Sequence, residues 1–326
     1  MTSSRHLVDP ELHALLDSFP EFELSDAILP LMRAAPPFTL DADQDGFAVV
    51  SSQRVIPGPD GAPNVEVLLH VPAETGALRG ALLHIHGGGY IAGSAEMGVP
   101  AHRLLANSLG AVVVSVQYRL APETRFPGAI EDCYAALAWL TRSCAEFAID
   151  PARIGVMGES AGGGLAASLA LMARDRGEYA LAFQHLIYPM IDDRTCLDPD
   201  PHPFAGEFIW TPHSNAFGWG ALLGVAPGSP DVSPYAAAAR AADLSRLPPT
   251  YLAVGALDLF LEENFEYARR LTRHGVCVEL HVYPGAFHAF NISPDAQISL
   301  QAQRDSLLAL SRALGQENGS GGSEPL

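Results

Sequence analysis

Short apolar runs rich in β-branched residues alternate with longer helical stretches from about residue 46 onward, and this alternation constrains the fold more than any other feature. Strands separated by segments long enough for a crossover helix are typical of a mainly parallel sheet with helices on both faces. The expected strands span residues 46–56, 65–71, 81–86, 112–117, 154–157, 183–188, 251–254 and 276–283. The expected crossover helices span residues 129–142, 161–176, 262–274 and 295–314. The sequence therefore predicts an eight-stranded α/β fold.

Parts of the chain fall outside this alternation. Residues 1–45 have the pattern of short amphipathic helices, and residues 190–245 hold many Pro, Gly and aromatic residues between two strands. A segment of that length without sheet pattern is usually a lid or a binding loop, so we interpret 1–45 and 190–245 as two parts of a cap. Residues 315–326, biased to Gly, Ser and Glu, are expected to be a disordered tail.

The charged residues exclude several classes of function. The formal net charge is −18, and all 19 basic residues are arginine. Without lysine, Schiff-base chemistry and a P-loop have no candidate residue. The acidic balance argues against nucleic acid and anionic membranes as partners, because both attractions come from clustered Lys and Arg.

The cysteines and the N-terminal residues bear on the cellular compartment. The four cysteines are widely spaced and form no C-x-x-C pair, so neither a disulfide framework nor a structural zinc site is predicted. The first residues hold no basic stretch followed by an apolar core, and we expect no signal peptide. No run reaches the roughly 20 apolar residues that span a bilayer. These features predict a cytoplasmic protein.

The strongest chemical signal is Gly158-Glu159-Ser160-Ala161-Gly162, which follows an expected strand and opens an apolar helix. A G-x-S-x-G motif between strand and helix indicates a nucleophile elbow, in which small neighbours let the chain turn sharply around an exposed serine. A serine hydroxyl is a poor nucleophile at neutral pH, so this interpretation requires a base and an orienting acid downstream.

Both groups are present, in the chain order Ser, acid, His. Asp258 follows the strand 251–254, and His288 follows the last strand in a Gly-containing turn. Both lie at carboxyl ends of strands, where ligands bind in open α/β sheets. Glu262 is an alternative acid, and Asp258 could instead cap the following helix.

A third element is His86-Gly87-Gly88-Gly89-Tyr90, which follows the strand 81–86. Consecutive glycines expose backbone N–H groups, as an oxyanion hole requires, and the N–H of Ala161 would complete it. His84 and His86 face the same side of a strand and could bind a metal together. No third ligand is evident nearby, so we predict no metal and assign His86 to anchoring the glycine loop.

These motifs together resemble the bacterial hormone-sensitive-lipase family of α/β-hydrolase esterases. The resemblance spans roughly residues 45–312. It rests on 86–90, on 118–123 followed by Phe126-Pro127 and Asp132, on 158–163, on Asp258 with Glu262, and on 285–290. It implies an α/β-hydrolase catalytic domain of residues 46–189 and 246–314 under a two-part helical cap.

The resemblance also implies roles for single residues. Ser160 is then the nucleophile, His288 the base and Asp258 the orienting acid, with Gly88, Gly89 and Ala161 as oxyanion donors. The chain departs from the family pattern at Glu159, at Gly164, where Asn is common, and at Leu259-Phe260. None of these departures removes a catalytic group.

The predicted function is a carboxylesterase that hydrolyses short to medium acyl esters through an acyl-enzyme, without a cofactor. The partner is a small-molecule ester, and the oligomeric state stays open, a homodimer included. An amidase or carbamate hydrolase would use the same triad, and a non-catalytic receptor on this fold is a further alternative. The substrate pocket is expected among aromatic side chains of the oxyanion loop and the cap, namely Tyr90, Phe204, Phe208, Trp210, Phe217 and Trp219.

Overall fold

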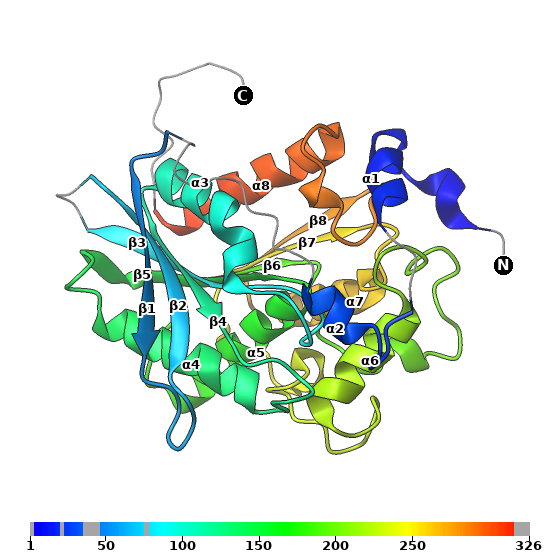
Figure 1. Ribbon diagram of the computed structural model, residues 1–326, viewed down its shortest axis with the longest axis horizontal. Coiled ribbons are helices and arrows are strands. Elements are labelled where there is room, and N and C mark those ends of the chain that lie inside the picture. The colour runs from blue at the N-terminus through cyan, green and yellow to red at the C-terminus, as the bar shows by residue number, and fades with distance from the viewer. Residues whose placement is uncertain (1–2, 20–22, 35–45, 75–77, 316–326) are drawn as a thin grey trace.

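One eight-stranded sheet organises the computed structural model, which describes residues 3–19, 23–34, 46–74 and 78–315. The strand order is β1-β2-β4-β3-β5-β6-β7-β8 (Figure 1). The strands are β1 (Val49–Ile56), β2 (Val65–Pro72), β3 (Arg79–Ile85), β4 (Val112–Gln117), β5 (Ile149–Glu159), β6 (Phe183–Ile187), β7 (Thr250–Gly255) and β8 (Val278–Tyr283). All eight predicted strands are confirmed.

The pairing is mixed at one edge and parallel elsewhere. Strands β1 and β2 form an antiparallel hairpin, and β2 pairs antiparallel with β4. Every other neighbouring pair in this sheet is parallel. Strand β5 begins earlier than predicted. Residues 150–153 lack an apolar strand pattern, yet Ile149 already pairs with Arg79 across a register shift. The parallel strands therefore end at one common edge.

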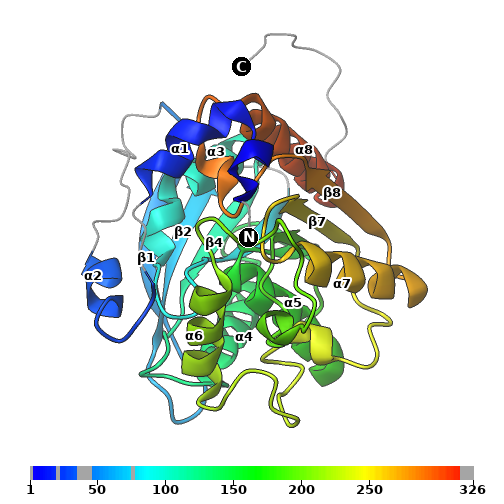
Figure 2. The same cartoon turned by 90° about the vertical axis from the view of Figure 1, so that its right-hand side faces the viewer.

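Helices cover both faces of the sheet. Helices α3 (Val99–Leu109) and α8 (Gln297–Ala313) lie on one face, and α4 (Gly128–Arg142), α5 (Ala161–Arg176) and α7 (Leu261–Arg273) lie on the other. Figure 2 shows α3 and α8 above the sheet and α4 and α5 below it. The sequence reasoning missed α3, although Pro100 in its first turn and Gly110 in the left-handed conformation at its end are both helix boundary signals.

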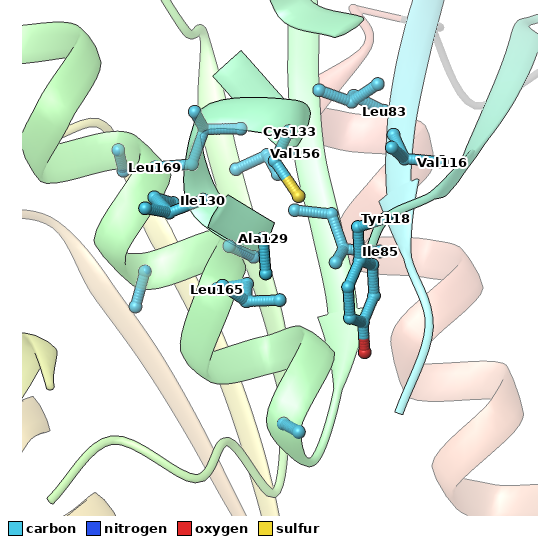
Figure 3. Close-up of a cluster of buried hydrophobic side chains, with 14 of the residues drawn as sticks. Leu83, Ile85, Val116, Tyr118, Ala129, Ile130, Cys133, Val156, Leu165 and Leu169 are labelled. Carbon is cyan, nitrogen blue, oxygen red and sulfur yellow. The ribbon is translucent and has the colours of Figure 1, made fainter. Parts of the chain in front are cut away.

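The main core lies between the sheet and helices α4 and α5. Alternate strand residues point to one face, so Leu83 and Ile85 of β3 both meet this layer (Figure 3). Ile130 of α4 and Leu165 of α5 fill the space opposite them. Leu82, which directly precedes Leu83 on the same strand, faces the other way and joins the cluster under α3 and α8. Each such side chain contributes about 1.5–3 kcal/mol by leaving water.

The two expected cap segments contact each other. The first carries α1 (His13–Ser18) and α2 (Leu29–Ala34), and the second carries α6 (Pro212–Leu223), which the sequence reasoning also missed. The backbone N–H of Ser4 donates to Glu207 Oε2 at 2.6 Å, and His213 Nε2 lies 2.9 Å from the Leu24 carbonyl oxygen.

Some sequence predictions cannot be compared with the structure. Residues 1–2, 20–22 and 35–45 of the first expected cap segment lie outside the described residues, as do residues 316–326 of the expected tail. Among the described helices, none is both long and apolar enough to cross a membrane.

Candidate active site

Ser160 occupies a sharp turn between β5 and α5. Its φ is 55° and its ψ is −122°, a conformation that side-chain-bearing residues rarely adopt. Two flanking glycines make the turn possible. A Cβ at Gly158 would lie 2.4 Å from the Gly162 carbonyl oxygen, and a Cβ at Gly162 would lie 2.0 Å from the Ile85 carbonyl oxygen. The G-x-S-x-G spacing is therefore a steric requirement of this turn.

His288 lies between Ser160 and Asp258. Its Nε2 is 3.0 Å from Ser160 Oγ, and its Nδ1 is 2.8 Å from Asp258 Oδ2. With the ring proton on Nδ1, the imidazole donates to the carboxylate and accepts the serine hydroxyl proton at Nε2. All three side chains are buried, and the Phe260 N–H donates to the other Asp258 oxygen at 2.9 Å. Glu262, the alternative acid, is exposed on α7.

The glycine loop packs directly on this turn. A Cβ at Gly87 would lie 3.5 Å from Ser160 Cβ. Gly88, Gly89 and Tyr90 follow with φ values of 119°, 61° and 68°. Within the described chain, no hydrogen-bond acceptor is found for the N–H groups of Gly88, Gly89 or Ala161. These N–H groups are thus free to bind a ligand oxygen beside Ser160.

The two histidines near the loop have different partners. His84 Nδ1 is 2.9 Å from Ser115 Oγ and its Nε2 is 2.9 Å from Glu159 Oε2. His86 Nδ1 is 2.8 Å from the Gly87 carbonyl oxygen, and burial lowers the pKa of this imidazole to about 4. Over residues 3–19, 23–34, 46–74 and 78–315, no group of three His, Cys, Asp or Glu side chains converges as a metal site does.

The predicted pocket aromatics separate into two groups. Trp210 lies over Gly89, with its ring centroid 6.3 Å from that of His288. The ring centroids of Phe208 and Phe287 lie 6.1 Å apart. Trp210 and Phe208 also line a cavity of about 830 Å³, which Leu24 and Met32 and several charged side chains line as well.

The other aromatic side chains lie elsewhere. Trp219 and Tyr90 are buried against each other, and the Tyr90 hydroxyl donates to the Met190 carbonyl oxygen at 2.7 Å. They expose almost no surface and do not line the cavity of about 830 Å³, so their place in the substrate pocket stays a prediction. Phe204 is 43% exposed and lies edge-on to His202. Phe217 packs half-buried against the main core.

Sequence reasoning missed a set of side chains that support the triad. The Tyr188 ring lies edge-on to His288, with centroids 4.7 Å apart, and its hydroxyl donates to Asn291 Oδ1 at 2.6 Å. Asn264 Nδ2 donates to the Pro189 carbonyl oxygen at 2.9 Å. The buried Glu263 carboxyl accepts the Ile191 N–H at 2.8 Å, and burial raises its pKa. Only the position of Tyr188 at a strand end pointed to this role.

Gly164, a departure from the family pattern, also has a steric reason. A Cβ at this position would lie 2.0 Å from the Met190 carbonyl oxygen and 2.5 Å from the Tyr90 hydroxyl. The glycine therefore makes room for the Tyr90–Met190 hydrogen bond that supports the oxyanion loop.

Comparison with known proteins places this site among hydrolases. Residues 82–292 match a family model described as alpha/beta hydrolase fold. The chain is 33% identical to carboxylesterase NlhH of Mycobacterium tuberculosis over 96% of this chain and 98% of the relative. It is 33% identical to esterase LipI of the same species over 87% and 88% of the two chains. A solved bacterial heroin esterase is 40% identical, covers 96% of this chain and 99% of its own, and superposes with a TM-score of 0.86.

Proposed function

The chain belongs to the alpha/beta hydrolase fold family, in its hormone-sensitive-lipase branch, and is a carboxylic ester hydrolase in which, we propose, Ser160, His288 and Asp258 carry out the hydrolysis. The observation that carries the assignment is the relay of 3.0 Å and 2.8 Å hydrogen bonds from Ser160 through His288 to Asp258. Such a relay activates a weak nucleophile without a cofactor.

The first half of the proposed reaction forms an acyl-enzyme. Ser160 Oγ attacks the ester carbonyl carbon while His288 Nε2 takes the hydroxyl proton, and Asp258 stabilises the resulting imidazolium. The carbonyl oxygen becomes an oxyanion that accepts hydrogen bonds from the free N–H groups of the glycine loop and Ala161. The carbon–oxygen bond to the alcohol then breaks, and His288 returns the proton to the departing alkoxide.

The second half regenerates the enzyme. Water enters, His288 takes one of its protons, and the hydroxide oxygen attacks the acyl carbon. A second oxyanion forms in the same loop and collapses with cleavage of the bond to Ser160 Oγ, which recovers its proton from His288. The products are one alcohol and one carboxylic acid.

We propose that residues 1–45 and 190–245 form the cap and that the cap sets the acyl preference. Trp210 of the second segment supports this assignment, since its indole lies over Gly89 with its ring centroid 6.3 Å from that of His288 and so bounds the space beside the triad. An acyl space that ends at this indole favours short to medium acyl chains over long ones, because an acyl chain gains about 0.8 kcal/mol per buried methylene only until the space is full.

Covalent labelling tests the nucleophile. A fluorophosphonate should modify Ser160 in the native enzyme, as peptide mass mapping would detect, and Ser160→Ala should abolish the label and lower kcat by at least roughly 10³ with the fold intact. Ser293→Ala is the matched control, because Ser293 is also a buried serine but lies outside the relay. Label on another serine, or near-normal turnover of a folded Ser160→Ala variant, would refute the assignment.

A paired substrate test separates ester from amide hydrolysis. Both reactions pass through the same triad, so the residues alone do not distinguish the leaving groups. We expect a nitrophenyl ester to be turned over much faster than the anilide of the same acid. An anilide rate close to the ester rate would favour an amidase.

We also propose that the protein works in the cytoplasm. Its four cysteines are free thiols, which fits a reducing compartment. Fractionation of the native cells tests this proposal, and recovery in the periplasmic or secreted fraction would contradict it. A homodimer stays a prediction, which light scattering on the purified enzyme would check.

A further inference from the structure

The guanidinium of Arg33, on helix α2 of the first cap segment, lies against the back of the oxyanion loop. Its Nε donates to the Ile91 carbonyl oxygen at 2.7 Å, and its Nη2 donates to the Ala121 carbonyl oxygen at 2.7 Å. Nη1 and Nη2 also donate to the Glu123 carboxylate at 2.8 Å and 2.9 Å. One side chain thus joins a cap helix to two neighbouring loops of the catalytic domain.

The two carbonyl groups need this partner. Ile91 is 0% exposed and Ala121 is 1% exposed. Among the described residues, Arg33 is the one donor found for either carbonyl oxygen. A buried carbonyl without a donor costs free energy comparable to a lost hydrogen bond, so both loops are more stable in the arrangement that Arg33 holds.

These loops support the residues that face Ser160. The Ala121 N–H donates to the Tyr90 carbonyl oxygen at 3.0 Å, and the Ile91 N–H donates to the Gly88 carbonyl oxygen at 3.1 Å. Gly88, Gly89 and Tyr90 all have positive φ. A run of left-handed residues persists only where the surroundings over-determine it, and Arg33 donates to the residue immediately after that run.

Glu123 completes the arrangement. It belongs to the sequence 118–123 on which the family resemblance partly rests, and the reaction itself does not use it. Its hydrogen bonds from Arg33 lower the pKa of the carboxyl to about 2, so it stays ionised and holds the guanidinium in orientation over the working pH range. The bidentate contact fixes the plane from which Arg33 reaches both carbonyl oxygens.

We propose that Arg33 is a positioning residue, which sets the N–H groups of Gly88 and Gly89 at the distance from Ser160 that the oxyanion requires. The inference rests on the proposed triad and oxyanion loop. Arg33 touches no reacting atom, and its effect reaches the reaction through the loop that follows Gly89.

A transition-state analogue provides the decisive readout. A trifluoromethyl ketone adds to Ser160 and leaves an oxyanion in the loop, whereas the product alcohol binds without one. Removing an oxyanion donor costs roughly 10²–10³ in kcat, and a displaced donor should cost less. We expect Arg33→Met to lower kcat about 10- to 100-fold and to weaken binding of the ketone by a similar factor. KM and the affinity for the alcohol should stay within about threefold of the native values.

Matched variants separate position from stability. Arg5→Met is the control, because Arg5 is also an arginine of the first cap segment but donates to the exposed Asp17. Arg33→Lys keeps the charge but cannot serve both carbonyl oxygens and Glu123, so it should fall between Met and the native enzyme. It also serves as the test if Arg33→Met fails to fold. Glu123→Gln leaves both carbonyl contacts but weakens the contact that orients the guanidinium, so its kcat should fall between that of Arg33→Met and that of the native enzyme.

Two results would overturn the proposal. One is a folded Arg33 variant with native kcat and native ketone affinity. The other is a loss of activity that follows only the folded fraction and disappears below the melting transition. A wrong triad assignment would give a different result, because the fluorophosphonate would then not modify Ser160 in the native enzyme.

Discussion

Replacing Trp210 by alanine should join the cap cavity to the site of ester hydrolysis. The indole is 6% exposed, lies over Gly89 and lines the cavity of about 830 Å³. Its Nε1 donates to Asn215 Oδ1 at 3.1 Å, and the preceding residue Ile209 has a φ of 63°, which is unusual for a β-branched side chain. The structure therefore holds Trp210 as a partition between the cavity and His288.

The size of the effect follows from burial. In the native enzyme an acyl chain that reaches the indole stops gaining contact. Without the indole, about four further methylenes could enter the cavity, each worth about 0.8 kcal/mol. The total of about 3 kcal/mol corresponds to roughly two hundredfold in kcat/KM. The entropy that the acyl chain loses on binding reduces this gain in kcat/KM. We therefore expect the ratio of dodecanoyl to butanoyl turnover to rise about 10- to 100-fold.

A series of nitrophenyl esters from acetyl to palmitoyl measures the change. The native optimum should lie between about four and eight acyl carbons with palmitoyl poor, because over-packing costs roughly 1–3 kcal/mol once the space is full. Trp210→Ala should move the optimum to longer chains and leave acetyl turnover within about tenfold. Loss of a buried indole can cost about 3–5 kcal/mol of stability, so the assay belongs well below the melting temperature.

Two further variants control for nonspecific effects. Trp210→Phe keeps most of the partition and should shift the profile less than alanine does. Trp139→Phe alters a half-buried tryptophan of α4 that packs on Phe147 and should leave the profile unchanged. An unchanged chain-length profile in folded Trp210→Ala would refute the partition. A native optimum at sixteen carbons would contradict the short-chain preference itself.

Other predictions concern the triad, metals and pH. His288→Ala should reduce kcat about as much as Ser160→Ala, and Asp258→Asn somewhat less, since the three groups act as a unit; turnover within tenfold of native in any of them would contradict the relay. Prolonged chelation should leave ester hydrolysis unchanged, because Ser160 and His288 supply nucleophile and base, and activity lost to a chelator and restored by one divalent metal would contradict this. Burial lowers the pKa of His70 and of His86 from 6.5 to about 4. As the pH falls, these two histidines therefore bind protons in the unfolded chain before they do so in the folded chain. The free energy of unfolding should decrease between about pH 6.5 and pH 4. We expect a lower urea midpoint at pH 5 than at pH 7.5, with a smaller difference in His70→Gln and His86→Gln, and equal midpoints at the two pH values would contradict the effect.

The fold was predictable where its signals are local. Strand alternation, glycine turns and apolar helices each involve a few neighbouring residues, so all eight strands could be identified. Helix α3 was missed although its sequence is as amphipathic as those of α4 and α8, and α6 was missed because it lies in a segment rich in Gly and aromatic residues. In α6, the Thr211 cap, Pro212 and the terminal Gly224 were the signals available.

The candidate triad was predictable for the same reason. Ser160 lies in a turn that only small neighbours allow, so its motif records a local steric need. Asp258 and His288 follow strands, and parallel strands bring their carboxyl ends to one edge. The sequence by itself thus determined which residues could meet.

Tertiary structure decided which contacts are made. Asp258 and Ser160 lie 30 and 128 residues from His288, and Arg33 lies 58 residues from Ile91. Trp210 and Trp219 occur in the same cap segment, yet one borders the triad and the other is buried against Tyr90. These outcomes depend on how the whole chain packs, because burial and hydrogen-bond partners come from segments distant in sequence and leave no mark on the local pattern.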